Sequence, residues 1–257
     1  MRVFPHLKKS YSAFTLLELM VVIAIIMVLA AIAFPVYSTV KMRSSKVEAM
    51  NMMRQLTGAA LSYAAANDNE LPREDSKGTD TWQAAADPLN EKAWYNALPK
   101  LVGRKTVGDY AKDPRAYYTK DNMLYLSGAT YPEGDKKLVR PLFAVAINTK
   151  LQRKDEDGKK PPLKLVNITE PARTVLFLEQ GLEGEKKSQP MQNKYDGSCK
   201  GSARSFVGRY GNTGLLGFAD GHVETADPRE VLTETGMFPF PQEEIVWTRT
   251  ADEDPNK

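Results

Sequence analysis

The side chain whose chemistry stands out is the carboxylate of Glu18, which lies at the edge of a long apolar segment. A carboxylate at the centre of a membrane helix costs about 2.5–3.5 kcal/mol unless a partner neutralises it. No lysine or arginine lies three or four residues away, where helical side chains meet. A cut between Ala13 and Phe14 would create an ammonium group on Phe14, four residues from Glu18. That amine could pair with Glu18 of its own chain or of a neighbouring subunit.

The apolar segment after Glu18 runs from Leu19 to Val40, 22 residues without a charged side chain. As an α-helix rising about 1.5 Å per residue it would span roughly 33 Å, enough for a bilayer core. The preceding residues 1–13 carry three basic and no acidic side chains, so we expect this leader to stay cytoplasmic. Pro35 lacks an N–H group and is predicted to kink the helix.

Three interpretations of this segment compete. In an ordinary signal peptide, Ala31-Ile32-Ala33 would be the cleavage site, but the apolar run exceeds the usual length of about 7–15 residues. A plain membrane anchor explains the length of the run and leaves Glu18 without a role. A segment that is cut after Ala13 explains both features.

The run Ala13-Phe14-Thr15-Leu16-Leu17-Glu18 resembles the cleavage and methylation site of type IV prepilins and type II secretion pseudopilins. This resemblance implies that a prepilin peptidase cuts before Phe14 and methylates its new amino group, and that Glu18 aids assembly. It also implies other pilin or pseudopilin subunits as partners, in the bacterial inner membrane. Pro35 matches a proline that is common in this family. The family usually has Gly where this chain has Ala13, so we expect cleavage to be retained at a lower rate.

Beyond the apolar run the helix is expected to continue as a stalk, because apolar side chains recur at spacings of three to four residues up to position 64. Asn67-Asp68-Asn69 and Pro72 should end it. The predicted segments are a cytoplasmic leader, a transmembrane helix, a stalk helix and a periplasmic pilin-like domain, at residues 1–13, 14–40, 41–66 and 67–257.

The rest of the chain contains one short predicted helix, from Asp87 to Leu98, followed by β-prone runs between Gly, Pro and Asp residues. The sequence therefore predicts an α+β fold in which a long kinked N-terminal helix packs against a C-terminal antiparallel β-sheet. The candidate strands are 123–126, 142–147, 174–178, 215–219, 222–225 and 245–248.

Asp220-Gly221 lies between two apolar runs and predicts a two-residue type I′ hairpin turn, which needs positive φ at both positions. Nine residues separate Tyr210 from this pair, a spacing that resembles the His-x9-Asp-Gly signature of a large pilin-like class. Because Tyr210 stands where that class has His, no role that needs an imidazole is carried over. His222 beside Asp220 could form a catalytic pair, but the position after a tight turn favours a hairpin residue.

The composition argues against catalysis and nucleic-acid binding. The net charge is only +3 and no basic stripe is interleaved with aromatic residues, so we expect no nucleic-acid partner. Cys199 is the only cysteine and there are two histidines, which restricts metal and histidine-base chemistry. No GxSxG, P-loop, HExxH or CxxC spacing occurs. We expect a structural subunit that is not an enzyme; the alternative is a membrane-anchored or secreted periplasmic enzyme or binding module.

Calcium is the one cofactor hypothesis. Asp155-Glu156-Asp157-Gly158 offers oxygen ligands, and the resemblance to pseudopilins, some of which bind calcium, supports it. The EF-hand spacing is missing and lysines surround the run, which favours a solvated loop without a metal.

Overall fold

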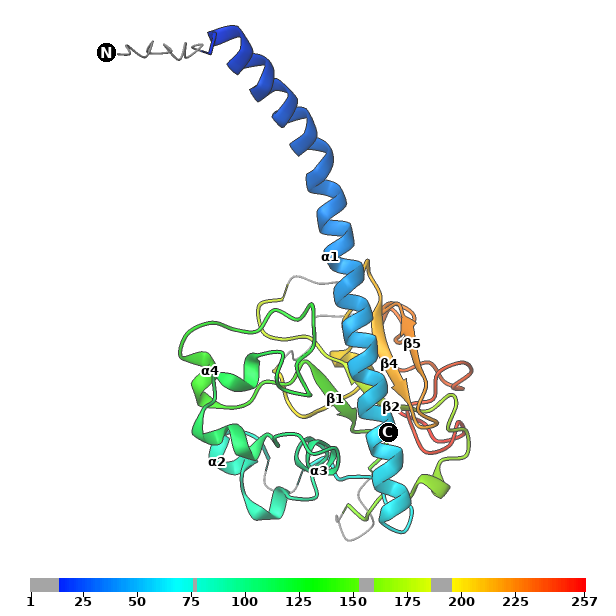
Figure 1. The fold of residues 1–257 in the computed structure, drawn as a ribbon. Coiled ribbons are helices and arrows are strands. Elements are labelled where there is room, and N and C mark those ends of the chain that lie inside the picture. Colours follow the sequence, from blue (N-terminus) through cyan, green and yellow to red (C-terminus); the bar gives the residue numbers. More distant parts are fainter. Residues whose placement is uncertain (1–13, 76–77, 153–159, 186–195) are drawn as a thin grey trace, which may run out of the picture. The chain divides into compact units, whose positions relative to one another are not determined.

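The computed structural model describes residues 14–75, 78–152, 160–185 and 196–257 (Figure 1). It divides into two compact units, residues 1–43 and residues 44–257, each described by itself below. The α+β architecture that the sequence predicts is confirmed: one long N-terminal helix precedes a five-stranded sheet.

Helix α1 (Leu16–Ala66) ends where the sequence predicts and begins two residues later than expected. Its C-terminal end is set by Asp68 and Asn69, whose φ angles of 50° and 62° are left-handed and cannot continue a right-handed helix. The helix does not end at Pro35. The side chain of Pro35 is not among those that the structure describes, so the kink there stays a prediction.

By length and composition, α1 is the one helix in the described part of the chain that could cross a membrane. Its most apolar stretch lies near the N-terminus and is entirely unburied. In the first unit, therefore, the structure leaves a wholly apolar helical surface uncovered.

The sheet of the second unit has the strand order β3-β1-β2-β4-β5. Its strand pairs are antiparallel, as the sequence predicts, except that the short strand β3 pairs in parallel with β1. Some fifty residues separate these two strands, and a parallel pair requires such a long connection. The strands are β1 (Val145–Asn148), β2 (Val175–Glu179), β3 (Lys200–Gly201), β4 (Gly214–Phe218) and β5 (Val223–Ala226).

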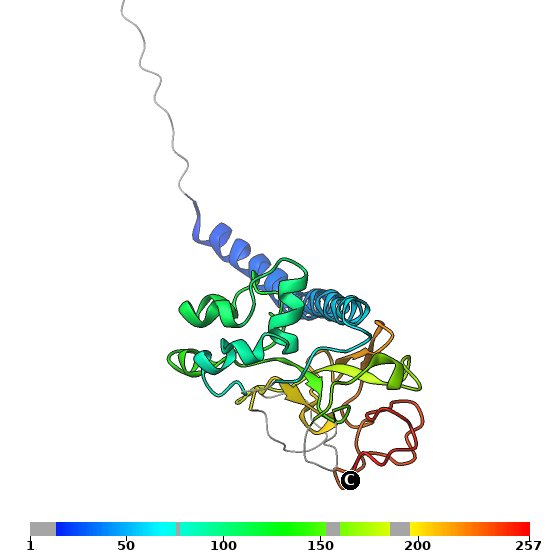
Figure 2. The same cartoon turned by 90° about the horizontal axis from the view of Figure 1, so that it is seen from below.

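Both faces of the sheet are covered, as the alternation along β4 shows. Leu215 belongs to the core cluster that includes the second half of α1, whereas Leu216 and Phe218 pack with residues of the C-terminal arm, residues 227–257. Gly217 lies so close to α1 that an added Cβ would be 2.6 Å from Cγ2 of Thr57. Figure 2 shows the helix and the red C-terminal arm on opposite sides of the strands.

The remaining helices are short, and one contains a proline. The predicted helix from Asp87 splits into a 3₁₀ turn (Pro88–Asn90) and helix α3 (Trp94–Leu101), which continues through Pro99. Pro99 has no N–H group to donate to the Tyr95 carbonyl, four residues earlier in the helix. That carbonyl instead accepts a hydrogen bond from the Val107 N–H at 3.3 Å. The other two are α2 (Trp82–Ala85) and α4 (Lys136–Val139).

Two of the predicted strands do not form. Residues 123–126 are a turn, held by the Asn122 side chain, which accepts the Leu124 N–H at 3.0 Å. Residues 245–248 make only a single bridge, from Val246 to Thr174. There the Gln242 side chain accepts the Trp247 N–H at 2.7 Å and so takes the place of a strand partner.

The turn between β4 and β5 forms at Asp220-Gly221 but is not of type I′. Gly221 has a φ of 99°, whereas Asp220 is not among the residues with positive φ, which type I′ requires. Gly221 N–H donates to the Phe218 carbonyl at 3.0 Å, and Phe218 N–H donates to the His222 carbonyl at 2.9 Å. This pattern is a three-residue loop with glycine in the left-handed position, because only glycine adopts that conformation without strain.

Candidate functional site

Glu18 is held by Thr15 at the start of α1. The Thr15 N–H donates to Glu18 Oε2 at 2.8 Å, the Thr15 hydroxyl donates to the same oxygen at 2.9 Å, and the Glu18 N–H donates to Thr15 Oγ1 at 3.2 Å. These reciprocal bonds form a capping box, which satisfies backbone donors that the first turn leaves free. The Thr-x-x-Glu spacing is the signal in the sequence, and our search for charged partners alone missed it.

The capping box gives Glu18 a role that does not depend on cleavage of the chain. Phe14 lies directly before the cap, outside the helix, with 82% of its surface exposed. Ala13, the other predicted cleavage residue, lies outside the described residues. The structure thus places Phe14 and Glu18 at one helix terminus, and the pairing of a Phe14 amine with Glu18 stays a prediction.

The first unit exposes apolar side chains in every direction around the helix. Its large apolar side chains from Leu16 to Val40 are between 46% and 77% exposed. A helix that is apolar all round is stable when lipid or other helices cover it. This surface is therefore the part of the first unit that we expect lipid or other helices to cover.

In the second unit, Tyr210 is buried and joins two segments far apart in sequence. Its hydroxyl lies 2.5 Å from the Ser127 carbonyl oxygen and 3.1 Å from Glu179 Oε1. Asp220 and Gly221 make separate bonds: the Asp220 carboxylate lies 2.5 Å from the His222 ring, and the Gly221 carbonyl accepts from the Thr57 hydroxyl at 2.9 Å. The three residues of the predicted hairpin motif therefore belong to two different sets of contacts.

Tyr210 belongs to a group of four side chains, Glu179, Glu185, Arg209 and Tyr210, which we call the buried ion cluster. The side chains of Arg209, Glu179 and Glu185 are 0% exposed. Arg209 Nη2 donates to Glu185 Oε2 at 2.6 Å and to the Gln180 carbonyl at 2.6 Å. Arg209 Nη1 lies 4.0 Å from Glu179 Oε1. One arginine thus faces two carboxylates in a place from which water is excluded.

The sequence analysis missed both carboxylates of the buried ion cluster. Glu179 ends strand β2, and an acid at the end of a fully apolar run is a signal that could have identified it. Glu185 carries no such signal. It accepts hydrogen bonds from the nearby Leu182 N–H at 2.9 Å and from the Thr130 N–H at 2.7 Å, and the second of these contacts arises only in the tertiary structure.

Burial raises the pKa of Glu179 to about 7, although the Arg209 charge and the Leu215 N–H favour the ionised carboxylate. The hydrogen-bond geometry around Glu179 is compatible with both the neutral and the ionised carboxyl group. A Tyr210 hydroxyl that donates to the Ser127 carbonyl can accept the proton of a neutral Glu179. An ionised Glu179 instead competes with Ser127 for the single proton of Tyr210.

We expect the Glu179→Gln variant to flatten the pH dependence of stability. A carboxyl whose pKa is about 7 when folded and 4.5 when unfolded binds more protons in the folded state between these values. The contribution of Glu179 to stability is therefore fully present below pH 4.5 and falls by roughly 3 kcal/mol as pH rises to 7, at 1.36 kcal/mol per unit. Denaturant titration of the full chain in detergent at pH 5 and pH 8, followed by tryptophan fluorescence, measures this difference.

Glu243 is exposed and serves as the matched control for this measurement. The Glu243→Gln variant should keep the wild-type loss of stability between pH 5 and pH 8. A Glu179→Gln variant that lost stability with pH as steeply as the wild type would show that another group titrates.

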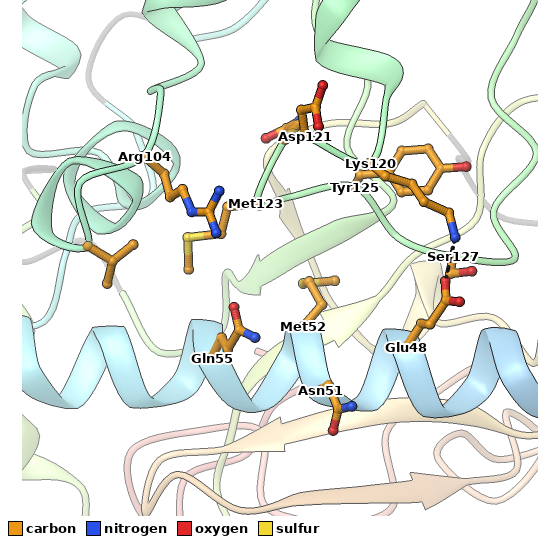
Figure 3. A pocket seen from close by; sticks show the side chains of 12 residues that line it. Glu48, Asn51, Met52, Gln55, Arg104, Lys120, Asp121, Met123, Tyr125 and Ser127 are labelled. Carbon is orange, nitrogen blue, oxygen red and sulfur yellow. Dashed lines mark hydrogen bonds and ion pairs between the residues drawn. The ribbon is translucent and has the colours of Figure 1, made fainter.

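The Tyr210 contacts also support the wall of a groove beside α1. The groove has a volume of about 630 Å³ and lies between residues 48–55 of the helix and residues 102–127 (Figure 3). Lys120 Nζ spans it to Glu48 Oε2 at 3.1 Å, as the dashed line shows. Its rim carries both signs of charge, and both partners of this ion pair are largely exposed, so the pair contributes little to stability.

The structure supports no catalytic or metal-binding arrangement for the other candidate residues that it describes. His222 stacks on Phe218 with ring centroids 4.3 Å apart and bonds to Asp220, which makes it a residue that stabilises the hairpin. Within residues 14–75, 78–152, 160–185 and 196–257, no three His, Cys, Asp or Glu side chains form a group suited to a metal ion. The calcium hypothesis concerns residues 155–158, which lie outside the described residues.

Comparison with known proteins places the similarity at the N-terminus. The prokaryotic N-terminal methylation motif matches residues 8–34. A similar protein is the fimbrial protein EcpC of Eikenella corrodens, which is 49% identical over 57 residues. This alignment covers 22% of the chain and 37% of that protein, so it spans little more than a third of the relative's length. No solved structure matches the chain.

The matched residues include Phe14, Thr15 and Glu18 and the first part of the exposed apolar helix. The motif therefore coincides with the part of the structure whose apolar surface is exposed. This chain therefore carries a prokaryotic N-terminal methylation motif at the start of a protein with an α+β fold.

Proposed function

We propose that the chain is a pilin-like subunit of a filament, either a type IV pilus or a type II secretion pseudopilus. In this proposal a prepilin peptidase cuts between Ala13 and Phe14 and methylates Phe14. Before assembly the apolar helix spans the bacterial inner membrane, with the N-terminus in the cytoplasm and the body in the periplasm. The body carries no catalytic role and decorates the filament.

The observation that carries this proposal is the uncovered apolar surface between Leu16 and Val40. A surface helix of a water-soluble protein is apolar on one side only, whereas this helix is apolar on all sides. Lipid covers such a surface before assembly, and a bundle of identical helices covers it afterwards. The bundle of helices also gives Glu18 a role, because a carboxylate among packed helices needs a charge partner. The Phe14 amine of a neighbouring subunit supplies that partner in this proposal.

The mature N-terminus tests the proposal. Mass spectrometry of the protein isolated from membranes of its host should find a chain that begins at methylated Phe14. A chain that begins at Met1 would exclude processing, and one that begins at Phe34 would identify a secreted protein released by signal peptidase after Ala33. The Ala13→Gly variant is the matched control, because it restores the residue usual before the cut and should increase the processed fraction.

A further inference from the structure

The C-terminal arm has a strong negative charge that the rest of the chain does not share. Residues 227–257 contain eight acidic and three basic side chains, whereas the whole chain has a net charge of +3. Three exposed acids, Glu230, Glu243 and Glu244, form no ion pair among the described residues. Their charges are therefore available to a partner.

These three acids surround a groove with an apolar lining, which we call the acidic groove. It has a volume of about 500 Å³ and lies between residues 230–233 and 239–247. Val231 and Trp247 are buried beneath it, and Phe240 is 52% exposed at its edge. Exposed aromatic surface beside carboxylates suits a partner that carries lysine or arginine on an apolar surface, since aliphatic stems pack on the ring and the charged ends reach the acids.

The chain itself carries a surface of this composition on helix α1, which we call the basic stripe: Lys46, Val47, Met50 and Arg54. Lys46, Met50 and Arg54 recur every four residues and so lie on one side of the helix. Val47 is 59% exposed beside them and the Arg54 side chain is exposed, whereas Lys46 and Met50 are half-buried and Met50 packs against the core. Lys46 Nζ makes a long contact, 3.5 Å from Thr213 Oγ1, and forms no ion pair with the residues that the structure describes.

We infer that the acidic groove binds the basic stripe of a second copy of this chain. Glu243 and Glu244 face Lys46 and Arg54 of that copy, and Phe240 packs against Val47. The two surfaces are different parts of the same chain, so the contact is heterologous and can repeat from copy to copy. An open filament needs a contact of this kind, and the inference rests in this respect on the proposed function.

Reversal of the charges on one surface at a time tests the inference. Full-length chains with Glu243→Lys and Glu244→Lys, or with Lys46→Glu and Arg54→Glu, should self-associate roughly tenfold more weakly in membranes, which corresponds to about 1.4 kcal/mol. A mixture of the two reversed chains should recover association, because each acidic surface again meets a basic one. The control Asp113→Lys changes an exposed acid outside the groove and should have no effect.

Disulfide cross-linking in native membranes provides the readout. Cys199 is 0% exposed, so single cysteines at Val47 in one chain and Glu244 in another report the contact without interference. We expect a Val47→Cys chain to cross-link to a Glu244→Cys chain, and an Asp113→Cys chain not to cross-link to it. Equal association of both reversed chains and the wild type, no recovery in the mixture, or cross-links to other proteins alone would overturn the inference.

Failure of the proposed function gives a different result. A chain that keeps residues 1–13 refutes processing and filament assembly, whatever the cross-linking shows. A processed and assembled chain that lacks the cross-link refutes only the contact between the acidic groove and the basic stripe.

Discussion

Replacement of Glu18 with alanine is expected to leave processing largely intact and to reduce filament assembly at least roughly tenfold, the factor that 1.4 kcal/mol represents. The physical reason is charge, because in the proposed filament the Phe14 amine of one subunit and Glu18 of another would neutralise each other. Without Glu18 the amine of an incoming subunit is left unpaired in an apolar surrounding. Quantification of sheared filaments against the processed subunit in membranes measures the loss.

The capping box makes a sharper experiment feasible. A glutamine at position 18 can still accept the Thr15 N–H but carries no charge, so the Glu18→Gln variant separates the two roles. We expect Glu18→Gln to assemble as poorly as Glu18→Ala, and Thr15→Val, which loses the hydroxyl and keeps the charge, to assemble better than both. Normal assembly of Glu18→Gln would show that the helix cap, and not the charge, is what Glu18 supplies.

The second large effect is expected in the buried ion cluster. The Arg209→Met variant keeps most of the side-chain volume and removes the charge that faces Glu179 and Glu185. Removal of one partner from a buried ion pair costs about 3–5 kcal/mol, because the remaining charge is left without compensation. This is a large part of the 5–15 kcal/mol by which a domain is usually stable. We expect the body to lose protease resistance and to unfold at a much lower denaturant concentration.

Two further variants show whether charge causes this loss. In the double variant Glu185→Gln with Arg209→Met one of the two carboxylates that Arg209 faces is made neutral, so part of the stability should return. The Arg229→Ala variant breaks a surface pair between the exposed Arg229 and the half-buried Asp227 and should cost less than about 1 kcal/mol. A single Arg209→Met variant as stable as the wild type would mean that Arg209 does not compensate the two buried carboxylates.

The Glu179 carboxylate and the Ser127 carbonyl explain why a tyrosine can occupy position 210. Its hydroxyl provides one proton to share between the Ser127 carbonyl and Glu179, and its ring packs against Gly128, where an added Cβ would be 2.9 Å from Tyr210 Cε1. Ser127, next to Gly128, also lines the groove beside α1 (Figure 3). Tyr210 is therefore a positioning residue for this wall of the body.

The sequence by itself determined the features that depend on neighbouring residues. The end of α1 at Ala66, the position of the turn at Asp220-Gly221 and the apolar helix that begins near Phe14 were all predictable, because helix propensity, left-handed backbone angles and hydrophobic period act over a few residues. Four of the predicted strands correspond to strands of the sheet, at β1, β2, β4 and β5. The capping box of Thr15 and Glu18 was equally local and could have been predicted.

Only the tertiary structure decided what lies beside what across long stretches of chain. Strand β3 joins β1 in parallel across some fifty residues, and Arg209 meets Glu179 and Glu185 from a different segment. Each outcome depends on which buried polar groups find partners once the core is closed, and that choice is made between residues distant in sequence. Position along the chain carries little information about such pairs, because burial and not spacing sets their energy.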